Sequence, residues 1–97
     1  MGKRTVRRVK KHDPKKGDRV RMLWVDITTC PTSAPEEVKP TPFTTEGFYL
    51  GEQLFEYGEH RIRYHLMSDT FDHIDQVFYG ATAYPVGCVL KLEVIGK

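Results

Sequence analysis

The 97-residue sequence predicts an all-β protein, a small closed barrel of five short strands preceded by a flexible basic arm. Three observations support this fold class. Apolar and polar side chains alternate with a period of two in most segments, which is typical of strands with one buried face. Glycine, proline and aspartate cluster between these segments, as they do in turns. No segment shows the 3.6-residue period of a helix longer than one or two turns.

The first strand is expected at residues 19–29, after the turn formed by residues 15–18. Residues 30–42 contain four prolines, which exclude a central strand and a long helix from this stretch. Ser33 is suited to cap a single helical turn there; otherwise the stretch is a stiff loop. The second strand is expected at residues 44–53, where Gly47 and Gly51 predict a bulge or a sharp coil.

Residues 56–59 predict a hairpin turn, and the third strand follows at residues 60–67 with the clearest alternation in the chain. A polar loop at residues 68–72 leads to an aromatic-rich fourth strand at 74–84. Pro85, Val86 and Gly87 form a tight break before the fifth strand at 88–95. The first and fourth strands are apolar on both faces, so we expect one of these faces to be covered by another subunit.

Five short strands with one long first loop describe a small SH3-like or Sm-like barrel. We expect a single domain at residues 18–97 and a flexible arm at residues 1–17. No run of about 18 apolar residues spans a bilayer, and no apolar stretch follows the basic N-terminus as in a secretory signal. Cys30 and Cys88 lack metal or redox spacing, so two reduced thiols in a cytoplasmic protein are expected, with one disulfide as the alternative.

Charge is divided unevenly along the chain. Residues 1–19 carry nine of the 15 lysines and arginines but two acidic residues, a net charge of +7, and the remainder carries −5. A cationic arm on an anionic body points to a polyanionic partner for the arm. The alternatives are a tail that increases solubility or a tail that docks on the acidic body itself.

Part of the sequence resembles Sm and Sm-like proteins. Residues 84–92, Tyr-Pro-Val-Gly-Cys-Val-Leu-Lys-Leu, are similar to their second signature, in which a short turn ending in glycine joins two apolar strands. Residues 44–50, with Gly47 inside a strand, loosely resemble the first signature. Residues 23–26, 45–48 and 85–89 together are also similar to small uncharacterised proteins of phages and prophages. The resemblance covers about residues 18–95.

The resemblance implies an RNA-binding barrel that assembles into homo-oligomeric rings by pairing the fourth strand of one copy with the fifth of the next. For a phage-encoded protein, the location is the bacterial cytoplasm. Two departures from the family signatures indicate that the usual uridine-binding pocket is absent or rebuilt. Val86 stands where the family carries Arg or Lys before the turn glycine, and the Asp and Asn of the first signature have no counterpart after Leu50.

Two groups of residues are candidates for nucleic-acid contact. The first group is the set of basic residues in the arm, Lys3, Arg4, Arg7, Arg8, Lys10, Lys11, Lys15 and Lys16. The second is the pair Arg61 and Arg63, which share one face of the third strand with His65 and are spaced to reach successive phosphates. The alternative for this pair is an exposed strand face paired with Glu46 or Glu52. Phe78 and Tyr84 are candidates for base stacking between subunits.

No catalytic residues, metal site or cofactor are expected. Asp69, Asp72, His73 and Asp75 lie close in sequence, but they lack the glycine and closing glutamate of a calcium loop, and a polar turn explains them. Neither cysteine has the context of a nucleophile, so we do not expect an enzyme. The sequence therefore predicts an accessory protein that binds RNA, with DNA as the alternative partner. Capture of a small nucleotide and a purely structural or protein-interaction role are the other hypotheses.

Overall fold

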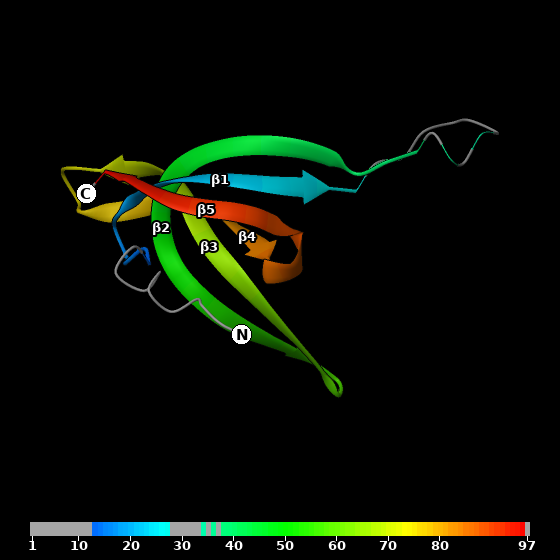
Figure 1. Ribbon diagram of the computed structural model, residues 1–97. Coiled ribbons are helices and arrows are strands. Elements are labelled where there is room, and N and C mark those ends of the chain that lie inside the picture. Colours follow the sequence, from blue (N-terminus) through cyan, green and yellow to red (C-terminus); the bar gives the residue numbers. More distant parts are fainter. Residues whose placement is uncertain (1–12, 28–33, 35, 37, 97) are drawn as a thin grey trace, which may run out of the picture.

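The computed structural model describes residues 13–27, 34, 36 and 38–96. It is an all-β fold built on one antiparallel sheet of five strands (Figure 1). The strands are β1 (Arg19–Asp26), β2 (Thr41–Tyr57), β3 (His60–Asp72), β4 (Val77–Pro85) and β5 (Val89–Gly96). A 3-10 turn, η4 (Val86–Cys88), joins β4 to β5. The order across the sheet is β4-β3-β2-β1-β5, so β4 and β5 lie at opposite edges.

The prediction of five strands is confirmed, but two of the strands are longer than expected. β2 is a central strand and begins at Thr41, so the expectation of no central strand in residues 30–42 is wrong for the last two residues. Pro42 pairs with Val25 near the start of the strand, where a missing N–H is tolerated. β3 continues to Asp72, because residues 68–72 pair with the first half of β4 instead of forming a loop. Ser33 and most of the helical turn that it was predicted to cap lie outside the described residues, as do Cys30 and the arm up to residue 12.

The prediction of a closed barrel is wrong. β4 pairs with β3 and β5 pairs with β1, and no ladder joins β4 to β5 in the described part of the chain. Pro85 ends β4 without a backbone donor, and η4 then leads into β5, which pairs with β1. The sheet instead coils around its core, and side chains bridge the two ends, with the Trp24 ring of β1 meeting the Tyr84 ring of β4 edge-on at 5.1 Å.

The core is small and lies on the concave face of the coiled sheet. Its buried members come from four strands: Val20, Met22, Tyr49, Met67 and Tyr84. Trp24, Val89, Leu92 and Val94 pack around them. The indole N–H of Trp24 donates to the Thr45 hydroxyl at 2.9 Å, so its one polar group is satisfied inside this cluster.

The glycines predicted to bend the second strand do so in two ways. A Cβ added to Gly47 would lie 2.6 Å from the Ser68 carbonyl oxygen, so glycine here allows β2 and β3 to approach closely. The register shifts between Tyr49 and Gly51, and Gly51 has a φ of 122°, which marks a bulge. Together these features coil β2 (Figure 1).

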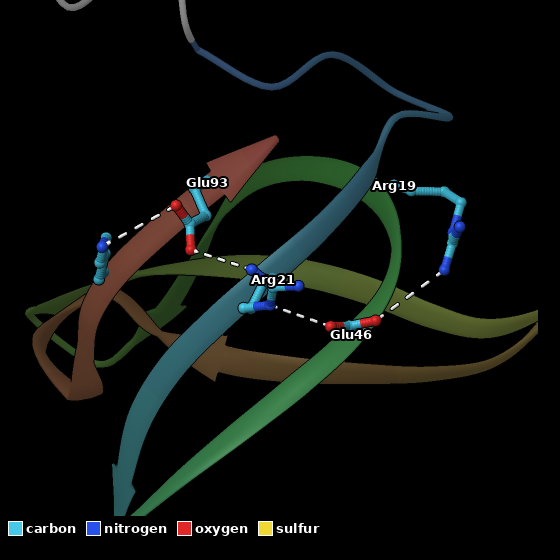
Figure 2. A network of polar contacts seen from close by, with 5 residues as sticks. Arg19, Arg21, Glu46 and Glu93 are labelled. Carbon is cyan, nitrogen blue, oxygen red and sulfur yellow. Dashed lines mark hydrogen bonds and ion pairs between the residues drawn. The ribbon is translucent and has the colours of Figure 1, made fainter. Parts of the chain in front are cut away.

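The convex face of the sheet carries an ion-pair network across three strands. Arg21 of β1 lies between Glu46 of β2 and Glu93 of β5, with its Nε 2.9 Å from a Glu46 oxygen (Figure 2). The hydrogen bond with Glu46 raises the pKa of Arg21. Arg19 and Lys91 extend the network at 4.0 Å and 3.9 Å. The basic residues of β1 and β5 therefore each face a glutamate within the sheet, with three cations sharing two carboxylates. Among the helices of the described segments, none is long and apolar enough to cross a membrane.

Candidate functional site

The described part of the basic segment is fixed against β2. The N–H of Gly17 donates to the Tyr49 carbonyl at 2.7 Å, and the N–H of Tyr49 donates to the Asp18 carbonyl at 2.8 Å. Within the turn, the Lys15 N–H donates to the Asp18 carboxylate at 2.9 Å, and Gly17 adopts a φ of 96°. This turn sets where the chain passes from the basic segment into the sheet.

A surface cavity of about 520 Å³ lies beside this turn. Its lining comes from the turn segment, β2, β3 and β5, and includes Asp13, Lys16, Tyr49, Glu52, His65 and Leu92. The volume falls within the range of small-molecule sites, about 300 to 1,000 Å³. The lining carries both signs of charge, so it favours no simple ion.

The polar centre of the cavity is a pair of rings. The Tyr49 hydroxyl and the Nδ1 of His65 are 2.9 Å apart, and the two rings are tilted with centroids 5.7 Å apart. Desolvation by burial lowers the pKa of His65, so the neutral imidazole is favoured. Desolvation, with Glu52 and Asp13 nearby, raises the pKa of Tyr49, so the hydroxyl keeps its proton. Sequence reasoning grouped His65 with the arginines and missed this partnership, because the bulge that aligns Tyr49 has no unique sequence signal.

The basic residues divide into two sets. The arginines of β1 and β3, and Lys91 of β5, all form ion pairs with glutamates: Arg19, Arg21, Arg61, Arg63 and Lys91. Lys15, Lys16 and Lys39 are exposed, and within the described segments their side chains form no ion pair. Of these unpaired cations, Lys15 and Lys16 lie where the basic arm joins the sheet, and Lys39 precedes β2.

Arg61 and Arg63 lie on the exposed distal part of the β2–β3 hairpin. Arg63 pairs with Glu52, its Nε 2.6 Å from the carboxylate, as the cross-strand alternative predicted. Arg61 pairs with Glu56 at 3.4 Å, a residue that the sequence reasoning did not name. Exposed pairs of this kind are weak, so a phosphate can compete for either guanidinium. Their role in nucleic-acid contact stays a prediction.

The two aromatic residues predicted to stack on bases lie in separate clusters. Phe78 packs against Phe71 and Phe48, with ring centroids 4.8 Å and 5.7 Å away. Tyr84 is a core residue with 8% of its surface exposed. In the β3–β4 ladder Tyr84 lies opposite His65 and Phe78 lies opposite Phe71, so neither ring is aligned with Arg61 or Arg63. The stacking pocket between subunits stays a prediction.

The acidic cluster at the β3–β4 connection forms a turn. A carboxylate oxygen of Asp72 accepts the N–H groups of Ile74 and Asp75 at 2.8 Å and 3.1 Å. Gln76 completes the turn with a φ of 59° and donates its N–H to the Asp72 carbonyl. No group of three metal-ligating residues occurs in the segments the structure describes. The two hydrogen bonds accepted by the Asp72 carboxylate agree with the interpretation that Asp72 turns the chain.

Comparison with family models, curated proteins and solved structures returns no match for this chain. The resemblance to Sm-like and phage proteins therefore remains a prediction.

Proposed function

We propose that this chain is an accessory protein that binds nucleic acid, RNA in the first place, through its basic N-terminal segment. The observation that carries the proposal is the separation of charge. Residues 1–18 carry eight basic and two acidic side chains, a net charge of +6, whereas the arginines of β1 and β3 (Arg19 included) and Lys91 of β5 are paired with glutamates. Lys and Arg side chains without internal partners bind phosphates at little cost, because no ion pair has to break first.

In this proposal the sheet is a carrier and the basic residues are the binding surface. Lys15 and Lys16 stand at the fixed turn, next to the Tyr49–His65 cavity. The other proposed contacts are those of the arm: Lys3, Arg4, Arg7, Arg8, Lys10 and Lys11. No aromatic residue is interleaved among them, so affinity comes from phosphate contacts and depends weakly on sequence.

The Sm-like part of the proposal concerns assembly. A ring that joins β4 of one copy to β5 of the next requires both strands to have an open edge, and both are sheet edges here. An oligomer would also present several basic arms to one strand of RNA, and this raises the effective concentration of the arms.

The test is RNA binding by the full chain, by a variant lacking residues 1–16, and by two matched charge variants. We expect the affinity of the full chain for a single-stranded RNA to fall steeply from low to physiological salt, and deletion to abolish binding. Lys15→Gln with Lys16→Gln removes two unpaired cations and should lower the salt slope by about 1.4, roughly 0.7 for each phosphate contact.

Arg61→Gln with Arg63→Gln removes the same charge from ion-paired positions, so it is the matched control. A smaller loss of affinity is expected here than for the lysine pair. Undiminished RNA binding by the chain lacking residues 1–16 would refute the arm as the binding element.

A second candidate function, capture of a small nucleotide, is favoured by the cavity at Tyr49 and His65. Its volume suits such a ligand, and Lys16 supplies one cation at its edge. Thermal stabilisation by free nucleotides, reduced by Tyr49→Phe and retained when residues 1–12 are removed, would support this function over RNA binding.

A further inference from the structure

The cavity beside the basic segment is lined by two polar side chains from opposite positions of one ladder. Glu52 of β2 pairs with His65 of β3 in the register, and both residues line the cavity. Side chains at opposite positions of an antiparallel pair share one face of the sheet, with Cβ atoms about 5 Å apart. Burial lowers the pKa of His65, and the charge of Glu52 acts against that change, as expected for near neighbours. One ligand can therefore contact both side chains.

Each of these two side chains has one polar atom engaged and one available. Arg63 contacts Glu52 at Oε2, and Oε1 has no contact in the described part of the chain. Tyr49 contacts His65 at Nδ1, and Nε2 has no hydrogen bond to another described residue. With the Tyr49 hydroxyl as the donor to Nδ1, the proton of the neutral imidazole lies on Nε2. The pair then offers an oxygen acceptor beside an N–H donor.

An acceptor beside a donor matches the Watson–Crick edge of cytosine or adenine. Each of these bases presents an amino group next to a ring nitrogen that carries no proton. The amino group can donate to the Glu52 carboxylate while the ring nitrogen accepts from the Nε2–H of His65. Uracil has the reverse arrangement, a carbonyl oxygen beside a ring N–H. It would set acceptor against acceptor and donor against donor.

We infer that the cavity takes one base of the bound RNA, a cytosine or an adenine, which Glu52 and His65 distinguish from uracil. The inference rests on the proposed function, because the basic segment brings the strand to the cavity. Lys16 lines the cavity and Lys15 precedes it in the fixed turn, so phosphates bound by these lysines lie beside the cavity. Leu92 of β5 gives the base an apolar wall. The arm thus supplies affinity without regard to sequence, and the cavity adds a preference at one nucleotide.

The experiment compares the binding of single-stranded oligocytidine and oligouridine of equal length to the full chain. The two strands carry the same charge and bases of similar size, so phosphate contacts alone would bind them alike. We expect the cytidine strand to bind about fivefold more tightly or better, as for one correctly paired base contact, and oligoadenosine to bind like it. Replacing the cytosine amino groups by hydrogen should reduce this preference, and this test requires no change in the protein.

A matched pair of variants assigns the preference to the cavity. Glu52→Ala removes the acceptor and should bring the ratio of the two affinities close to one. Glu56→Ala is the control, because Glu56 is also paired with an arginine of β3 but does not line the cavity. Both variants remove one negative charge and release one arginine, so overall affinity changes alike. The ratio should stay at its original value in Glu56→Ala.

The outcomes separate this inference from the proposed function. Equal affinity for the two strands, in a chain whose RNA binding requires residues 1–16, would overturn the inference and leave the proposed function standing. A cytidine preference that persists in Glu52→Ala would do the same, because the base would then be recognised elsewhere. Binding of none of the strands would overturn both.

Discussion

The two halves of the β2–β3 hairpin use the same antiparallel ladder in opposite environments. In the half near the core, Tyr49 and Met67 are 6% and 3% exposed. In the distal half, Phe55 and Tyr57 are 51% and 69% exposed, although their strands remain paired to the turn. The ladder therefore continues where burial stops, supported by cross-strand ion pairs and by Gly58, whose φ of 61° suits a two-residue turn. Stability should be concentrated in the inner half.

The largest expected effect that tests this comparison is at Gly47, in the inner half. Gly47→Ala would put a methyl group 2.6 Å from the Ser68 carbonyl oxygen and 3.2 Å from the Met67 methyl. Because the obstacle is backbone, β2 and β3 must move apart, and we expect the free energy of unfolding to fall by about 2 kcal/mol. Urea denaturation monitored by Trp24 fluorescence measures it.

Gly87→Ala provides the control, since an added Cβ there meets nothing within 4 Å and the glycine has no positive φ. Its free energy of unfolding should change by less than about 0.5 kcal/mol. Equal stability of the two variants would show that the close approach at Gly47 is relieved without cost. The claim that stability is concentrated in the inner half of the hairpin would then be wrong.

This comparison also shows what the sequence could and could not predict. Period-two alternation placed all five strands, because a side chain faces core or solvent by its position in the pleat. Strand ends were less accurate. Residues 68–72 are mostly polar, but they form part of β3 because they pair with β4. Ser68 is buried, and its hydroxyl is within hydrogen-bond distance of the backbone oxygens of Thr70 and Tyr79. Local composition carries no information about such a distant partner.

Closure and the cavity could not be predicted for a related reason. Whether β4 pairs with β5 depends on the twist and curvature accumulated over all five strands and on the end of β4 at Pro85. A local sequence pattern does not determine that total curvature. The Tyr49–His65 pair depends on the bulge between Tyr49 and Gly51, whose position within a strand containing two glycines is set by the neighbouring strand. The charge division, by contrast, follows directly from the sequence.

An intermediate effect is expected at His65, where the two halves meet. Burial lowers its pKa in the folded state, so the unfolded chain binds the proton more readily. Stability should therefore fall as the pH drops below the ordinary histidine pKa of 6.5, and it is fully present above it. Protonation also costs the Nδ1 acceptor that faces the Tyr49 hydroxyl.

The measurement is the free energy of unfolding as a function of pH for the full chain and for Tyr49→Phe and His65→Gln. At neutral pH, Tyr49→Phe should cost about 1 kcal/mol for the lost hydrogen bond. His65→Gln should remove the part of the pH dependence that lies near 6.5. An unchanged pH profile in His65→Gln would show that another group titrates near pH 6.5. Protonation of His65 would then not be the cause of the loss of stability at low pH.

The smallest effect belongs to the distal half. Arg63 pairs with Glu52 across the hairpin, but two thirds of its side chain is exposed, at 67%. Arg63→Gln should therefore lower the free energy of unfolding by no more than about 0.5 kcal/mol, and added salt should shrink the difference further. Arg61→Gln, which breaks the pair with Glu56, should behave alike. A loss of about 2 kcal/mol from either variant would mean that the distal ladder supports the core, because exposed pairs alone do not contribute that much.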